Sequence, residues 1–135
     1  MKITRINPPE VPGRGDVTRI ITVEGPSKLV WLSSQKPQGA DMRSVAPGNF
    51  KAQYEFVMDK LQLQLQAIGA TWDDVVLRKM YLVDVEGFHA YCRHPESKAY
   101  FDKSPCGSAI GVTRLSHPDF LVEIELVVAV PAEGS

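Results

Sequence analysis

The alternation of apolar and polar residues is clearest near the end of the chain, where it predicts a β-strand over residues 120–130. Every second residue in this range is apolar, so these side chains share one face of the strand. Glu123 and Glu125 lie on the other face, which becomes apolar after them. A strand that is apolar on both faces is usually covered on both faces. The predicted helices are enough to cover only one face of the sheet. We therefore expect another subunit to cover the second face.

Four shorter apolar stretches predict further strands, over residues 17–24, 29–34, 74–84 and 108–115. A short link that contains Gly-Pro separates the first two, which predicts that they pair as a hairpin. The residues before these strands are rich in proline and glycine, and this composition predicts an irregular segment.

Two other segments carry helix signals. Apolar residues recur at helical spacing over residues 50–68, with Asn49 placed to cap the start and Gly69 placed to end the helix. Residues 85–103 hold a second helix candidate that is interrupted near Pro95, a residue that suits the first turn of a later helical part. A helix that is apolar on one face packs that face on a flat apolar surface, which the predicted strands provide.

The size and charge of the chain limit the kind of protein that it forms. Its 135 residues suit a single domain spanning residues 1–135, which buries roughly two thirds of its unfolded surface without disulfides or metals. A formal net charge of -1 provides no basic surface for nucleic acid. The sequence shows neither a signal-peptide core nor a run of roughly 20 apolar residues, so we expect a cytoplasmic protein with no membrane partner.

Several separated segments, taken in order, resemble the RidA/YjgF/L-PSP family. They are LVWLSSQKP, AQYEFVMDKLQLQLQAIGATWDDVV, MYLVD, GFHAY and SPCGSAIGVTRLSHPDFLVEIELVVAV, within residues 17–130. The resemblance implies an α+β fold of the chorismate mutase-like type, with a mixed six-stranded sheet and two helices on one face. It also implies a homotrimer with three clefts between neighbouring subunits, which agrees with a last strand that is apolar on both faces.

The resemblance further implies a chemistry. Founding members of the family hydrolyse reactive enamines and imines, such as 2-aminoacrylate, to ketoacids and ammonia without a cofactor. An arginine at the start of the penultimate strand holds the substrate carboxylate by a bidentate ion pair. A glutamate on the last strand positions water or moves protons. Backbone groups and an aromatic residue of the N-terminal loop complete the pocket, so we expect a small-molecule substrate and no cofactor.

Carried over position by position, the resemblance keeps the glutamate and loses the arginine. Glu123 matches the glutamate, whereas Gly107 stands at the arginine's position. Cys92 stands where the family has an asparagine in its second helix, and the N-terminal aromatic residue falls near Val17. The other substrate-binding residues that the resemblance implies are Ser33, Ser34, Gln35, Cys106, Ser108 and Ala109.

Two other arginines are candidates to replace the missing one. Arg114 lies seven residues after Gly107, roughly 23 Å along a strand and on the opposite face, so it does not substitute within its own subunit. Arg14, in a Gly-Arg-Gly loop of the N-terminal segment, is the better candidate, and its alternative interpretation is a solvated loop arginine. Gly107 and Gly111 weaken a strand unless backbone or ligand approaches closely, which would fit a pocket widened by loss of the arginine side chain.

The cysteines and histidines suggest two further chemistries. Cys92 and Cys106 could supply a thiol nucleophile, although no histidine is paired with either in sequence and a small packed side chain is the alternative. The three histidines lack the spacing of metal ligands, so we predict no metal.

From these observations we expect a cofactor-independent enzyme that hydrolyses an imine, an enamine or a related carbonyl derivative. Glu123 is its expected general acid/base. Because the carboxylate clamp is missing, we expect weak or no 2-aminoacrylate deaminase activity. A lyase or tautomerase on the same scaffold is the nearest variant, and a trimer that binds a metabolite without chemistry is the main alternative. A ribonuclease or translation inhibitor is a weaker alternative, because phosphate contacts need clustered Lys or Arg.

Overall fold

The computed structural model describes residues 1–13 and 17–133, so Arg14 lies outside the described residues. The chain forms six strands, two α-helices and one 3-10 turn within these ranges. In chain order they are β1 (Lys2–Ile6), β2 (Ile20–Glu24), β3 (Ser27–Gln35), α1 (Phe50–Ala67), the 3-10 turn Trp72–Asp74, β4 (Val75–Leu82), α2 (Val85–Arg93), β5 (Cys106–Gly111) and β6 (Val122–Pro131).

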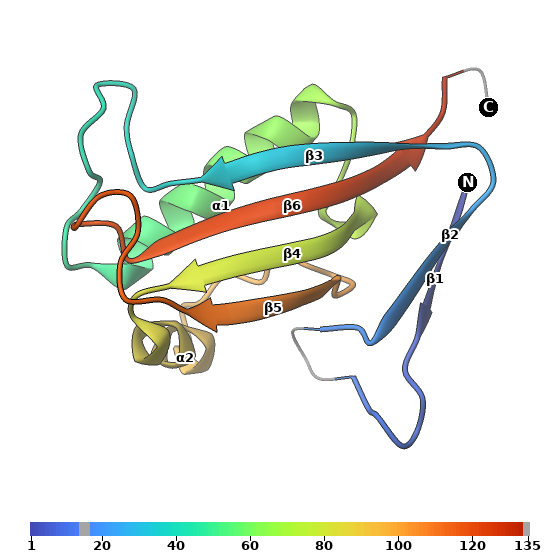
Figure 1. Cartoon of the computed structure of the whole chain (residues 1–135), viewed down its shortest axis with the longest axis horizontal. Helices are drawn as coiled ribbons and strands as arrows, with labels where there is room; N and C mark the ends of the chain where they lie inside the picture. Colours follow the sequence, from blue (N-terminus) through green and yellow to red (C-terminus); the bar gives the residue numbers. More distant parts are fainter. Residues whose placement is uncertain (14–16, 134–135) are drawn as a thin grey trace.

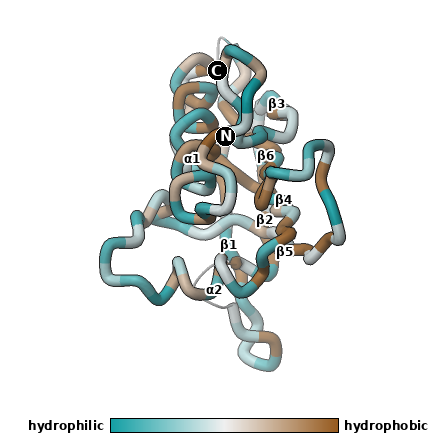
Figure 2. Tube along the Cα trace, turned by 90° about the vertical axis from the view of Figure 1, so that its left-hand side faces the viewer, coloured by the Kyte–Doolittle hydropathy of each residue, from teal (hydrophilic) through white to brown (hydrophobic). Residues whose placement is uncertain are grey.

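Four of the strands form a mixed sheet in the order β3-β6-β4-β5 (Figure 1). β6 runs antiparallel to both β3 and β4, whereas β4 and β5 run parallel. Both helices lie on one side of this sheet, as the side view in Figure 2 shows. The mixed sheet covered by two helices on one face is therefore confirmed. The other face carries no helix among the described residues, and we call it the open face.

The other two strands do not join this sheet. β1 pairs antiparallel with β2, with Lys2 opposite Glu24 and Ile6 opposite Ile20, and the pair leads away from β3 in Figure 1. The predicted hairpin between residues 17–24 and 29–34 was wrong, and so was the single six-stranded sheet. Gly25, with φ of 84°, and Pro26 make a bend here. β2 takes β1 as its partner, a strand within the segment that was predicted to be irregular.

The two-stranded sheet is fastened to the segment that precedes β5. The Arg5 guanidinium donates from Nε to the Ser104 carbonyl (3.2 Å) and from Nη2 to the Asp73 carbonyl (2.9 Å). Thr18 donates its backbone N–H to the Pro105 carbonyl (2.9 Å) and its hydroxyl to the Ser104 carbonyl (2.7 Å). These bonds hold the N-terminal segment against the start of β5.

Helix α1 begins and ends as predicted. The Asn49 side chain accepts a hydrogen bond from the backbone N–H of Ala52 (3.0 Å), and Gly69 follows the helix with φ of 69°. The apolar face of α1 packs on the apolar face of β6. Their fully buried side chains are Val57, Met58, Leu61 and Leu65 on α1 and Val122, Ile124, Leu126 and Val128 on β6. Each such side chain stabilises the fold by roughly 1.5–3 kcal/mol, so this contact forms the centre of the core.

The second helix ends at Arg93, and the later helical part predicted to begin at Pro95 does not form. The chain instead crosses the surface with its aromatic side chains turned inward. Trp72 packs edge-on against Tyr100 and Phe101, with ring centroids 5.6 and 4.9 Å away. Packing of these two adjacent rings outweighs the local preference for a helix.

One polar side chain inside the core supports the loops at the end of the sheet. The Gln53 amide is fully buried, donates to the carbonyl of Asp119 (2.8 Å) and accepts from the backbone N–H of Leu121 (2.8 Å). Replacing Gln53 with Leu leaves these two backbone groups without partners, so we expect a loss of about 2–4 kcal/mol in the free energy of unfolding. Urea denaturation measures the loss. Gln66→Leu, at an exposed position of the same helix, is the control and should change stability by less than about 0.5 kcal/mol; equal effects of both substitutions would contradict the prediction.

Candidate functional site

The open face of the sheet carries the two glutamates of β6. Glu125 accepts a hydrogen bond from the Tyr81 hydroxyl (2.8 Å), and this bond raises the pKa of Tyr81. Glu123 lies opposite Tyr81 on the neighbouring strand and is half-buried. Glu123 makes no hydrogen bond or ion pair with any residue that the structure describes. Of the two carboxylates, Glu125 is therefore engaged within the chain, and Glu123 is the one available to a ligand.

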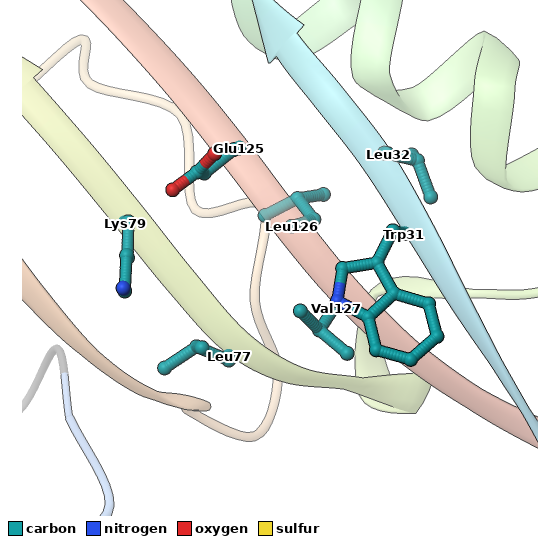
Figure 3. A pocket seen from close by; sticks show the side chains of 7 residues that line it. All are labelled: Trp31, Leu32, Leu77, Lys79, Glu125, Leu126 and Val127. Atoms are coloured by element: carbon teal, nitrogen blue, oxygen red, sulfur yellow. The ribbon is translucent and has the colours of Figure 1, made fainter.

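The open face is apolar around Trp31. The Trp31 side chain on β3 is 70% exposed and lies against Val127 of β6 (Figure 3). Leu77 of β4 joins them around a shallow cavity of about 150 Å³, with Lys79 and Glu125 at its polar end. A large exposed apolar area of this kind on one sheet face marks a surface that binds another molecule.

A larger hollow of about 550 Å³ lies beside α2, on the helix side of the sheet. It is bounded by α2, by residues 97–104 and by β4 and β5. Its lining residues are Tyr54, Arg78, Phe88, His89, Tyr91, Cys92, Ser97, Lys98, Ala99, Tyr100, Phe101, Ser104 and Ala109. The Arg78 side chain is only 6% exposed, and its guanidinium carbon lies 5.1 Å from the centroid of the Phe101 ring.

Two tyrosines give this hollow aromatic walls. The Tyr91 hydroxyl donates to Glu55 on α1 (2.8 Å), and the Tyr100 hydroxyl donates to Asp59 on α1 (3.1 Å). Burial raises the pKa of Tyr91 to about 12, and burial also raises the pKa of Tyr100. Both phenols therefore stay protonated at neutral pH, with their hydroxyls committed to α1.

The sequence-predicted residues near β5 divide between the two faces. Cys92 and Ala109 line the hollow, and Gly107 shares their side of the sheet because it pairs with Arg78. Cys106 and Ser108 pair with Leu77 and Lys79, so they lie on the open face. The Cys106 sulfur lies 3.8 Å from the Arg19 carbonyl, and Val17 is half-buried in the segment that Thr18 fastens to Pro105.

The residues at the end of β3 lie close to Glu123 instead. The pairing of β3 with β6 shifts at Ser33 and Ser34, after which Gln35 pairs with Ile124, next to Glu123. The Gln35 side chain accepts a hydrogen bond from Gln64 of α1 (2.9 Å). β6 and β4 separate β3 from β5, so one chain holds these residues and the β5 group in two separate places.

Gly107 has a steric reason in the folded chain. A Cβ atom added at this position would overlap the backbone carbonyl oxygen of Arg78 and lie 3.1 Å from its carbonyl carbon. The glycine therefore permits close approach of β4 and β5. Of the two alternatives that the sequence offered for Gly107, close approach of backbone or of a ligand, the structure shows the backbone contact, and any side chain here requires a backbone shift.

Sequence reasoning missed Arg78. The alternation of side chains along the strand could have identified it. Arg78, Met80 and Leu82 share the buried face of β4, and a charged residue on a buried face is unusual. The apolar content of this segment predicts the strand, whereas the burial of Arg78 on the inward-facing side of β4 follows from the alternation of its side chains.

The described residues form neither a metal site nor a Ser-His-Asp relay. No group of three His, Cys, Asp or Glu in residues 1–13 and 17–133 is placed to hold a metal ion. Ser44 and Asp119 both approach Nδ1 of His117, at 3.2 and 3.8 Å, so they do not form a relay through the two ring nitrogens. Within the described parts of the chain, no helix is both long enough and apolar enough to cross a bilayer.

The mixed sheet, the two helices on one face and the carboxylate on the last strand define a protein of the Rid type. The chain belongs to the family described as Endoribonuclease L-PSP, whose model matches residues 21–130. The RidA/YjgF/L-PSP resemblance is thereby confirmed at the level of the family.

Relatives and solved structures agree. The RutC family protein slr0709 of Synechocystis is 34% identical over 92 residues, which are 67% of this chain and 68% of the relative. The RutC family protein SSO3206 of Saccharolobus solfataricus is 29% identical over 99 residues, or 73% and 77% of the two chains. The crystal structure of the Rid family protein YyfB from Yersinia pestis, of unknown function, is 25% identical, with a TM-score of 0.78 over 96% of this chain and 100% of that one. The E. coli YjgF gene product gives a TM-score of 0.56 at 26% identity over 74% and 79%.

Proposed function

We propose that this protein is a cofactor-independent hydrolase of small imines or enamines, and that it acts as a homotrimer. The observation that carries the proposal is the half-buried Glu123, which has no hydrogen bond or ion pair within the described chain and lies beside an exposed apolar surface. An apolar sheet face that displays Trp31 and Leu29, 70% and 50% exposed, suits burial against second and third copies.

The trimer also accounts for the division of the predicted residues. Glu123 and the end of β3 form one group, and β5 with α2 forms the other, with β4 between the strand of Glu123 and β5. A cleft between neighbouring subunits would join the first group of one copy to the second group of the next. The active site is then incomplete in a single chain, and activity requires assembly.

The chemistry needs one carboxylate and one water. Glu123 takes a proton from water as the oxygen attacks the carbon of the protonated imine, which gives a neutral tetrahedral carbinolamine. The carboxylic acid then returns the proton to the nitrogen, and the C–N bond breaks with its electron pair leaving on ammonia. The hydroxyl proton passes to the departing ammonia as the carbonyl group forms. One imine and one water give one carbonyl product and one ammonia, so no oxidant, reductant or metal is consumed.

The assay for this function is ammonia release from imines generated in situ. Because Gly107 stands where the family resemblance places a carboxylate-binding arginine, we expect ammonia release from 2-aminoacrylate to be at least about tenfold slower than with a relative that keeps this arginine. Rates measured on the two proteins at equal concentrations of 2-aminoacrylate test this expectation. If the protein releases ammonia from no imine faster than buffer does, the hydrolase proposal is contradicted. That result would favour a trimer that binds a metabolite without chemistry.

A further inference from the structure

The immediate neighbours of Glu123 on the open face lead beyond the proposed function. Tyr81 of β4 lies opposite Glu123, and Ile110 of β5 lies opposite Tyr81 in turn. Residues paired in this way point to the same face of a sheet, and neighbouring strands are about 4.8 Å apart. The three side chains therefore form one row across β6, β4 and β5, with the carboxylate at one end and two apolar groups beside it.

We propose that Tyr81 and Ile110 bind the apolar part of the substrate and so determine which imines the protein accepts. When the reactive carbon lies at Glu123, a substrate side chain directed along the row lies over the Tyr81 ring and extends toward Ile110. The favoured substrates are then imines that carry a long apolar or aromatic side chain. This inference rests on the proposed function, because it assigns the substrate class of the same site.

The Tyr81 ring is held in place for this role. Its backbone lies opposite Glu123, whereas its hydroxyl donates to Glu125 (2.8 Å), two residues further along β6. The half-buried ring therefore lies beside Glu123 in a fixed orientation. Because the hydroxyl already has its partner, a ligand that covers the ring leaves no polar group unpaired. A surface that is ordered in advance also loses little conformational entropy when it binds.

Apolar residues continue this surface at the same end of the sheet. The Ile110 side chain is 39% exposed on the edge strand β5. Val83, two residues after Tyr81, is 37% exposed, and its backbone N–H donates to the carbonyl of Leu121 (2.9 Å), two residues before Glu123. The carboxylate is thus bordered by apolar side chains that a substrate can cover.

A polar row separates this surface from the apolar area around Trp31. Glu125 of β6 pairs with Lys79 of β4, and Lys79 pairs with Ser108 of β5. These three residues lie side by side on the open face, between the row of Glu123 and the Trp31 area. The apolar surface at Tyr81 and Ile110 is therefore distinct from the one that we propose for subunit contact, and it adjoins the carboxylate that acts on the substrate.

The imines of phenylalanine and alanine test the inference, because they differ only in a phenyl ring. We expect kcat/KM for ammonia release to be at least about tenfold higher with the phenylalanine imine. Ile110→Thr keeps the branched Cβ and removes the apolar end, and Tyr81→Thr removes the ring. Each should lower kcat/KM for the phenylalanine imine by about tenfold and leave that for the alanine imine within about threefold. A loss of folding or assembly would instead lower both values together.

Two further variants serve as controls. Tyr81→Phe keeps the ring and should retain the preference for the phenylalanine imine. Ile6→Thr changes an isoleucine of similar exposure, 42%, on β1 of the other sheet, and should leave both values unchanged. Equal kcat/KM of the wild-type protein for the two imines would overturn the inference, as would an unchanged preference in both Ile110→Thr and Tyr81→Thr.

The two ketoacid products distinguish failure of this inference from failure of the proposed function. Phenylpyruvate should bind the wild-type protein at least about tenfold more tightly than pyruvate in ligand-observed NMR titrations, and Ile110→Thr and Tyr81→Thr should remove this difference. If neither imine is hydrolysed but this difference is observed, the hydrolase fails and the binding surface stands. If both imines are hydrolysed at equal rates, the hydrolase stands and the binding surface fails.

Discussion

Replacing Glu123 with glutamine is expected to lower the rate of imine hydrolysis by about 10²–10⁴-fold, the range that general acid–base catalysis contributes. Glutamine keeps the size and the carbonyl oxygen of the side chain but cannot take a proton from water. Since Glu123 makes no hydrogen bond or ion pair within the described chain, the substitution breaks no described contact, and the fold and the assembly should persist. Steady-state ammonia release measures the effect, with light scattering as the check on the mass.

Glu125→Gln provides the matched control two residues further along the same face of β6. A glutamine there still accepts a hydrogen bond from the Tyr81 hydroxyl through its carbonyl oxygen. Its rate should stay within about threefold of the wild-type rate, since a retained neutral hydrogen bond costs less than about 1 kcal/mol. A Glu123→Gln protein with an undiminished rate would assign the chemistry to another group.

Replacing Trp31 with glutamate is expected to convert the assembly into monomers and to remove hydrolysis at the same time. The indole lies 70% exposed on the open face, where it reaches from the edge strand β3 against Val127 of β6. Burial of a side chain of this size contributes roughly 1.5–3 kcal/mol for each copy, and an unpaired carboxylate in its place adds a desolvation cost of several kcal/mol. Light scattering after size-exclusion chromatography should give the protomer mass of 14.9 kDa.

Leu63→Glu is the control for this experiment, because Leu63 is another exposed apolar residue, 57% exposed on α1. Since α1 lies on the helix side of the sheet, the substitution should leave the mass and the activity unchanged. A wild-type protein that is already monomeric, or a Trp31→Glu protein that keeps its oligomer mass, would contradict the subunit interface. A monomer that retains full hydrolysis would remove the argument that two subunits share each site.

The family and the main elements could be predicted because the signals for them are local. The helix caps at Asn49 and Gly69 and the alternation along β6 depend on neighbours within a few residues, and the structure agrees at each of them. The resemblance to the Rid family rests on the same kind of short, ordered segments. It matched Glu123 to the family's glutamate, and the role of that carboxylate is a prediction for the assay.

The errors lie where partners are distant in sequence. β2 could pair with β3 across a short link or with β1 across a longer one, and local composition does not rank these choices. Pro95 suits a helix start, yet the rings of Tyr100 and Phe101 find packing against Trp72 that only the folded chain supplies. In both places a long-range contact outweighs a local preference.

The sequence by itself determined that Glu123 lies on the face of β6 opposite the core, because side chains along a strand alternate between its faces. It also determined that the arginine expected at position 107 is absent. Only the tertiary structure decided which residue lies beside position 107. The parallel pairing of β4 with β5 brings Arg78 beside Gly107, across 28 residues of chain, and no local rule fixes which residue of one strand meets which residue of another.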